Sequence, residues 1–128
     1  MHTFIVTTSL EFLFAVVVLT KFVLPESVSN TAIIIYLLLR TWLSLSYIFG
    51  AKICAGYLKA RFPRTAFVDF VRDSNMYASV TAGVLAGVLH TIGILPLLFA
   101  ALYFLTVALN QLGYVVILYV YDKVEPIH

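Results

Sequence analysis

Four strongly polar side chains interrupt the apolar segments of this chain: Glu11, Arg40 and the neighbouring pair Asn110 and Gln111. An ionisable group in hydrocarbon is unfavourable unless it is paired or faces water, so such groups mark a functional site or a structural contact. As a functional site, Glu11 would bind a proton or cation and Arg40 would tune its affinity. As a structural contact, the carboxylate and the guanidinium would fix the register of two helices or dock a partner helix. Both interpretations are open at this point.

Counting along the chain predicts that these groups lie at one depth. If the first turn is centred near Ser27, Glu11 lies 16 positions before it and Arg40 lies 13 positions after it. On antiparallel helices that rise ~1.5 Å per residue, the two side chains would differ in height by about 4 to 5 Å. Asn110 and Gln111 lie about 14 positions beyond a second expected reversal. We therefore expect a polar layer near the middle of a helical bundle.

The composition indicates a membrane protein. Of the 128 residues, 62% are hydrophobic and 11% are charged, and the mean hydropathy is +1.04. Soluble domains carry roughly 25% charged residues, so this chain has too little polar surface to cover a soluble globule. We expect a single all-α integral membrane domain over residues 1–128. The net charge of +2 comes mostly from one segment, which argues against nucleic acid as a partner.

Four transmembrane helices fit the apolar segments. Pro25 to Asn30 combines helix-breaking with helix-capping residues. The apolar stretch 76–121 would reach roughly 69 Å as one helix of about 46 residues, so it must reverse near Gly93 and Pro96. The first segment lacks the basic start and the cleavage site of a secretory signal, so we expect it to be retained. The expected spans are about 3–24, 31–57, 76–95 and 97–121.

The segment 58–75 is basic and predicts the topology. It carries four cations, whereas the opposite boundary carries only Lys21. By the positive-inside rule this loop is cytoplasmic, and an even number of spans places both termini on the same side. Two structures fit the loop: a short interfacial helix with Phe67, Phe70 and Val71 on one face, or an ordinary polar connection. The four cations are Lys59, Arg61, Arg64 and Arg72.

Small residues recur at helical spacing in two of the expected spans. Small side chains let helices approach closely in a membrane, whether the partner helix belongs to the same chain, to an identical copy or to another protein. Packing within the chain is the simplest interpretation. The stronger strip is Ser79, Gly83, Gly87 and Thr91, and the weaker strip is Ser46, Gly50 and Cys54.

The sequence contains no complete metal-binding or catalytic motif. His90 has no second histidine one turn away and no carboxylate near it, and His2 and His128 are expected at the opposite membrane face. Cys54 is the only cysteine, which excludes an intrachain disulfide or a cysteine cluster. We expect no enzymatic activity of its own and no cofactor, although bound membrane lipid is expected. We expect His90 to act as a ligand only in a site that is shared with another subunit.

Several tyrosines are expected near the cytoplasmic boundary of the membrane. An aromatic belt at the level of the lipid headgroups is the more common reason for such a placement. A pocket for a quinone or a lipid is the alternative. These residues are Tyr57, Tyr77, Tyr114, Tyr119 and Tyr121.

Three functions fit these features. The leading expectation is a small non-catalytic subunit that packs within a larger membrane protein complex, which could itself be an enzyme, and stabilises it. The second is a homo-oligomeric transporter or channel with Glu11 as the coupling carboxylate. A four-helix chain with an acid in its first helix is similar to the small multidrug resistance transporters, but Arg40 and the long basic loop differ from that family's pattern, so its sites are not transferred. The third is a haem or quinone anchor that uses His90 and a partner ligand.

Overall fold

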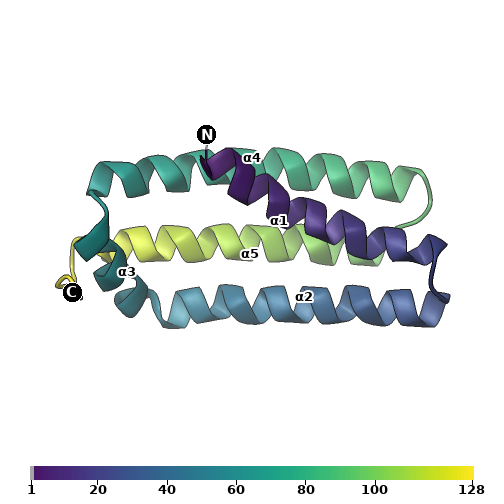
Figure 1. Cartoon of the computed structure of the whole chain (residues 1–128), viewed down its shortest axis with the longest axis horizontal. Coiled ribbons are helices and arrows are strands. Elements are labelled where there is room, and N and C mark those ends of the chain that lie inside the picture. Colours follow the sequence, from purple (N-terminus) through teal and green to yellow (C-terminus); the bar gives the residue numbers. More distant parts are fainter. Residues whose placement is uncertain (1) are drawn as a thin grey trace.

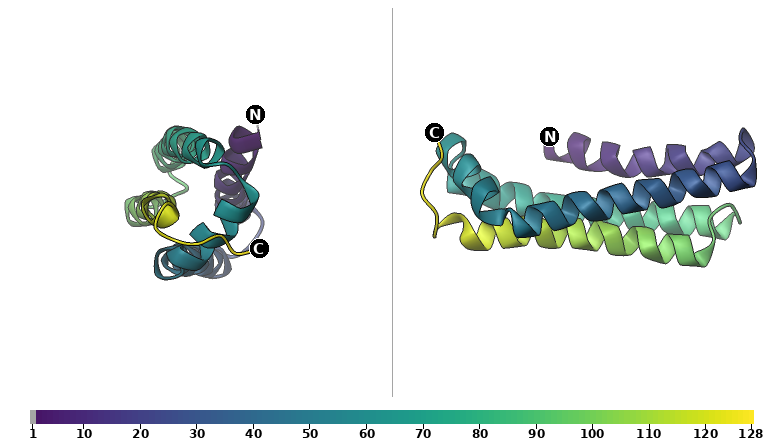
Figure 2. Two further views of the ribbon diagram at one scale, coloured as in Figure 1. Left: turned by 90° about the vertical axis from the view of Figure 1, so that its left-hand side faces the viewer. Right: turned by 90° about the horizontal axis from the view of Figure 1, so that it is seen from below.

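The computed structural model describes residues 2–128, and every regular element in that range is helical (Figure 1). Four long helices run side by side, and one short helix folds across the end of the bundle where the C-terminus lies (Figures 1 and 2). The elements are α1 (His2–Leu19), a 3-10 turn η1 (Thr20–Phe22), α2 (Glu26–Phe49), the short α3 (Ala51–Arg61), α4 (Arg64–Thr91) and α5 (Leu97–Tyr121).

Proline and glycine set the boundaries of the helices. Pro25, Pro63 and Pro96 each immediately precede a helix, and their carbonyls accept the first helical hydrogen bonds, at 3.0, 3.3 and 3.0 Å. Proline suits this position because its missing N–H has no intrahelical acceptor there. Gly93 follows α4 with φ of 86°, a left-handed conformation that favours glycine. The reversals expected near Pro25 and between residues 90 and 96 are therefore present.

Two segments differ from the prediction. The expected span 31–57 is divided at Gly50 into α2 and α3, because the glycine weakens the helix and the chain must turn across the bundle. The expected interfacial helix is not a separate element, and the third helix does not begin at residue 76. Instead α4 runs unbroken from Arg64, so Phe67, Phe70 and Val71 lie in its first turns. Phe67 and Val71 are buried there against α3 and α5.

The apolar interior consists of two clusters. One fills the middle of the bundle, where Phe14 of α1, Ile33 of α2, Ala82 of α4 and Tyr103 of α5 are fully or almost fully buried. The other lies at the α3 end and includes Ala55, Phe67 and Tyr121. Both α2 and α4 pack extensively against α5, which is the central helix of the bundle in Figure 1.

Three helical segments are long and apolar enough to cross a membrane: Thr3–Phe22, Glu26–Phe49 and Leu97–Tyr121. α4 does not meet this criterion, because its first part is charged and its second part includes polar residues such as Asn75, Ser79 and His90. Large apolar side chains also cover the outside of the bundle, with Trp42 at 68% exposure. An all-helical chain with this surface suits a membrane environment.

Candidate functional site

Glu11 and Arg40 form an ion pair inside the bundle. Glu11 on α1 is completely buried, and the Arg40 side chain on α2 is 9% exposed. Arg40 Nη1 lies 2.5 Å from Glu11 Oε1. The contact joins two helices that the turn near Pro25 makes antiparallel, as the count of residues along the chain predicted. Among the described residues, no donor meets Oε1 with hydrogen-bond geometry, so this oxygen is stabilised by the charge of the guanidinium.

Tyr103 and Tyr36 complete the polar network around the pair. The Tyr103 hydroxyl on α5 donates a 3.1 Å hydrogen bond to Glu11 Oε2. Arg40 Nη1 donates to the Tyr36 hydroxyl at 3.0 Å, and that hydroxyl donates to the Leu10 carbonyl at 3.1 Å. The network therefore ties α2 and α5 to α1. Neither tyrosine was predicted from the sequence, although Tyr36 lies one helical turn before Arg40 and thus on the same face.

Aromatic packing covers the Glu11 side of this network, whereas the bond from Tyr36 to Leu10 is exposed. The Phe14 ring stacks on Tyr103 with 3.9 Å between ring centroids, and it lies 5.3 Å from the Tyr36 ring. Three cavities occur elsewhere in the molecule, and Glu11, Arg40 and Tyr103 line none of these three. Charges as buried as those of Glu11 and Arg40 interact strongly with each other. The arrangement is chemically suited to fixing helices in place.

Asn110 and Gln111 belong to a different part of the bundle. Asn110 is buried on α5, two helical turns beyond Tyr103. Gln111 Oε1 accepts a 3.2 Å hydrogen bond from the Ser74 hydroxyl of α4. Gln111 and Asn75 also line a cavity of about 320 Å³ between α4 and α5. No hydrogen bond or ion pair within residues 2–128 joins these amides to Glu11 or Arg40, so the expected polar layer is divided between two helix interfaces.

The stronger small-residue strip faces outward. The buried face of α4 consists mainly of Ala78, Ala82 and Leu89. A Cβ atom added at Gly87 would meet nothing within 4 Å, and one added at Gly83 would lie 4.0 Å from the Phe104 ring. The simplest interpretation of the sequence is that this strip packs closely within the chain. Among the described residues, the strip is exposed instead. Its exposed members are Ser79, Gly83, Gly87 and Thr91.

The weaker strip has three separate roles. Ser46 is exposed, and its hydroxyl donates to the Trp42 carbonyl of the same helix. Gly50 separates α2 from α3, and Cys54 lines a cavity. The close approach of two helices occurs instead at Gly113 of α5, where an added Cβ would lie 3.1 Å from the Tyr47 Cβ of α2. Sequence reasoning missed this glycine, although it lies three positions after Asn110.

His90 is exposed at the end of α4. Its Nδ1 donates a 3.0 Å hydrogen bond to the Leu95 carbonyl, which ties the ring to the reversal before α5. The position of the His2 side chain lies outside the described part of the structure. Among the described residues, no three His, Cys, Asp or Glu side chains gather in a way that could hold a metal ion.

The tyrosines near the basic end do not form one group. Tyr57 and Tyr114 line the cavity that Cys54 also lines. Tyr121 is buried and donates to the Phe62 carbonyl at 2.7 Å. Tyr119 is exposed beneath the Lys123 ammonium, whereas Tyr77 packs edge-on against Phe4. Tyr119 and Tyr57 are the exposed members of this group, and exposure is typical of an aromatic belt.

Comparisons with protein-family models, with curated proteins and with solved structures find no match to this chain.

Proposed function

We propose that this protein is a small non-catalytic membrane subunit that packs within a larger membrane protein complex and stabilises it. The observation that carries the proposal is the buried ion pair between Glu11 and Arg40. A coupling carboxylate has to exchange its proton or cation with water, and polar groups used in this way face a wet path. Glu11 is instead fully buried, with one oxygen paired to Arg40 and the other bonded to Tyr103. This arrangement favours a clamp over a transport site.

The topology we propose has four spans, with α4 as the third. α4 packs against both α1 and α5 and runs alongside α5, which supports an orientation across the membrane. Its charged first part lies at the same end as α3, where Arg64 pairs with Asp122 of the C-terminal segment at 3.0 Å. The segment 58–75 and both termini would then lie on the cytoplasmic side.

The outward strip of α4 supports assembly with another helix. Glycine and serine on a lipid-facing surface permit close approach of a partner helix and the dispersion contacts that drive association in lipid. Gly87 has no neighbouring side chain in this molecule within 4 Å of an added Cβ. We propose that a helix of a different subunit packs there.

Gentle extraction of the native protein, followed by mass measurement of the intact assembly, tests this function. We expect a complex that contains at least one other polypeptide in fixed stoichiometry. Gly87→Ile should release the chain from that complex, because the added side chain blocks close approach, while the isolated variant keeps its helical content. Val84→Ile is the matched control, since Val84 is exposed on the same helix but already carries a branched side chain.

Two outcomes would contradict the proposal. A homo-oligomer that carries out proton-linked transport would favour the transporter alternative. An assembly with a haem absorption band that disappears in His90→Ala would favour the anchor alternative.

A further inference from the structure

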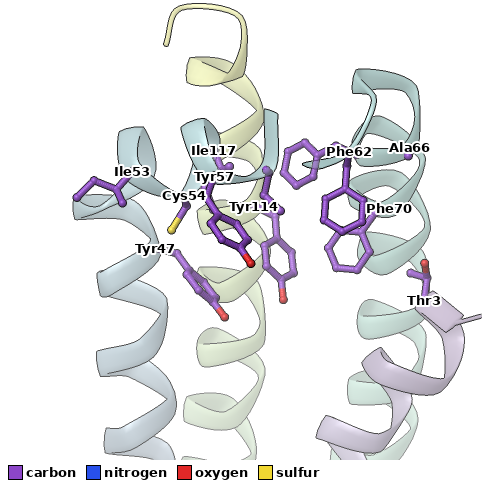
Figure 3. A pocket seen from close by; sticks show the side chains of 12 residues that line it. Thr3, Tyr47, Ile53, Cys54, Tyr57, Phe62, Ala66, Phe70, Tyr114 and Ile117 are labelled. Atoms are coloured by element: carbon purple, nitrogen blue, oxygen red, sulfur yellow. The ribbon is translucent and has the colours of Figure 1, made fainter. Parts of the chain in front are cut away.

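A cavity of about 810 Å³ lies at the basic end of the bundle, away from the Glu11–Arg40 pair (Figure 3). Its walls come from α2, α3, the start of α4 and the second half of α5, and Thr3 of α1 borders it. Half of its twelve lining residues are aromatic. These six are Tyr47, Tyr57, Phe62, Phe67, Phe70 and Tyr114.

Of the residues of α1, Thr3 lines this cavity. In Figure 1 and in the right-hand view of Figure 2, the N-terminus lies beside the middle of α4, well before α3. The cavity is therefore enclosed mainly by α2, α3, α4 and α5. Water does not fill apolar cavities well, whereas hydrocarbon does, so the bilayer itself is the natural source of an occupant.

Three hydroxyl groups point into this space. Tyr47, Tyr57 and Tyr114 direct their hydroxyls the same way, toward the interior of the bundle (Figure 3). The rings of Tyr47 and Tyr114 lie 5.7 Å apart. None of the three hydroxyls forms a hydrogen bond with another residue of the described chain. An apolar cavity with a few free donors is the usual form of a small-ligand site, and its volume falls within the range of roughly 300–1,000 Å³ for such sites.

One cation, Arg61, contacts a side chain that lines the cavity. The Arg61 guanidinium lies over the ring of Tyr57, with Cζ 3.7 Å from the ring centroid. Arg61 Nη1 donates to two carbonyls, those of Tyr57 at 3.1 Å and Ile127 at 2.9 Å. Lys59 likewise donates to the Val124 carbonyl at 3.0 Å. Within residues 2–128 no carboxylate forms an ion pair with either cation, in contrast to Arg64 and Arg72, which pair with aspartates.

We propose that this cavity binds one anionic glycerophospholipid from the surrounding membrane. An acyl chain lies among the aromatic rings, and the phosphate lies at Arg61, whose guanidinium covers the ring of Tyr57. Both parts of the ligand are needed to match the site: the apolar walls favour a hydrocarbon chain, and Arg61, which has no carboxylate partner among the described residues, favours an anion. This inference is independent of the proposed function, because the cavity and its lining residues are separate from the Glu11–Arg40 pair.

Native mass spectrometry of the full-length protein, reconstituted with equal amounts of phosphatidylglycerol and phosphatidylcholine with the same chains, tests the site. We expect one phosphatidylglycerol to remain bound per chain. Ala66→Trp, which fills the cavity from its α4 wall, should remove the bound lipid of either kind. Arg61→Gln should leave a lipid bound but reduce the preference for phosphatidylglycerol about fivefold, the effect of one cation near a lipid headgroup.

The controls are Ala101→Trp and Arg72→Gln. Ala101 is exposed on α5 and does not line this cavity, and the Arg72 charge already pairs with Asp69. Both variants should bind lipid as the wild type does. Equal lipid binding by Ala66→Trp and wild type, or an unchanged headgroup preference in Arg61→Gln, would overturn the proposal. A stoichiometric quinone that co-purifies with the wild type and is lost in Ala66→Trp would also overturn it.

Cys54 provides a second measurement that needs no substitution. It is the only cysteine of the chain and lines the cavity. Phosphatidylglycerol added to the delipidated protein should slow the reaction of Cys54 with N-ethylmaleimide more than phosphatidylcholine does. Equal rates with and without phosphatidylglycerol would mean that the cavity holds no such lipid.

Discussion

Glu11 and Arg40 are stabilised inside the protein by each other and by tyrosines rather than by water. Their spacing on either side of Ser27 predicted that they would lie near each other, because a short turn between antiparallel helices relates position to depth. Tyr103 was not predictable in this way. It lies 92 positions from Glu11, and its contact depends on how α5 is rotated against α1, which no local pattern encodes. The expected common depth of Asn110 and the pair is not found, because Asn110 lies two helical turns beyond Tyr103 on α5.

Tyr103→Phe should destabilise the protein without disturbing its shape. The phenyl ring can keep the stacking with Phe14, but Glu11 Oε2 loses its buried donor. Hydrogen bonds to charged groups contribute about 1.5–3 kcal/mol, so the free energy of unfolding should fall by about that amount. Denaturant unfolding in detergent, followed by circular dichroism, measures the change.

Tyr119→Phe is the matched control, because Tyr119 is exposed and lies far from the buried pair along α5. It should unfold at nearly the same denaturant concentration as the wild type. Equal stability of Tyr103→Phe and Tyr119→Phe would mean that the Tyr103 hydroxyl contributes nothing to the clamp.

At the scale of helices, boundaries marked by proline could be predicted and those that depend on packing could not. Pro25 and Pro96 favour the start of a helix through their own backbone geometry, which does not depend on how the rest of the chain packs. The division at Gly50 was missed because a single glycine only weakens a helix. The continuity of α4 was missed because its charged first turns resemble a loop. Their helical form is supported by the burial of Phe67 and Val71 against α3 and α5, contacts that arise only in the folded chain.

Gly113→Ala should weaken the packing of α2 against α5. The new methyl group would lie 3.1 Å from the Tyr47 Cβ and 3.5 Å from the Ser44 carbonyl oxygen. Both atoms are attached directly to the backbone of α2, so neither can move away freely. Overpacking of this kind lowers the free energy of unfolding by about 1–3 kcal/mol. The shift of the thermal unfolding midpoint in detergent measures it.

Gly87→Ala serves as the control for this change, since nothing lies within 4 Å of its added methyl group. Alanine favours helix over glycine by roughly 0.5–1 kcal/mol, so Gly87→Ala should be neutral or slightly stabilising in the isolated protein. If both variants shifted the midpoint equally, the close approach at Gly113 would not be the cause.

At the scale of the whole molecule, composition predicted the helical class and the membrane environment, whereas the number of spans depends on α4. Its first part is charged and its second part is apolar, so hydropathy alone does not assign it. The structure adds that α4 packs beside α5, and the Arg64–Asp122 pair brings the start of one near the end of the other. These contacts support a fourth span.

Labelling of single cysteines in a Cys54→Ser background tests this topology. Positions for the new cysteines are Ser27, Thr65 and Glu125, all exposed at the ends of helices or in the tail. With four spans, an impermeant maleimide should reach positions 65 and 125 from the same side of the membrane and position 27 from the other. If α4 lay along the surface instead, positions 65 and 125 would react from opposite sides.

The most direct test of the clamp is a double-mutant cycle on Glu11 and Arg40 in the purified protein. Glu11→Leu and Arg40→Met should each reduce the free energy of unfolding by about 3–5 kcal/mol, because each leaves a buried charge without its partner, and the double variant should recover most of that loss. The exposed pair is the control: Arg64→Met and Asp122→Leu should each change stability by less than about 1 kcal/mol. A double variant as unstable as either single one would contradict the clamp. So would a Glu11→Gln variant of normal stability that has lost proton-linked transport.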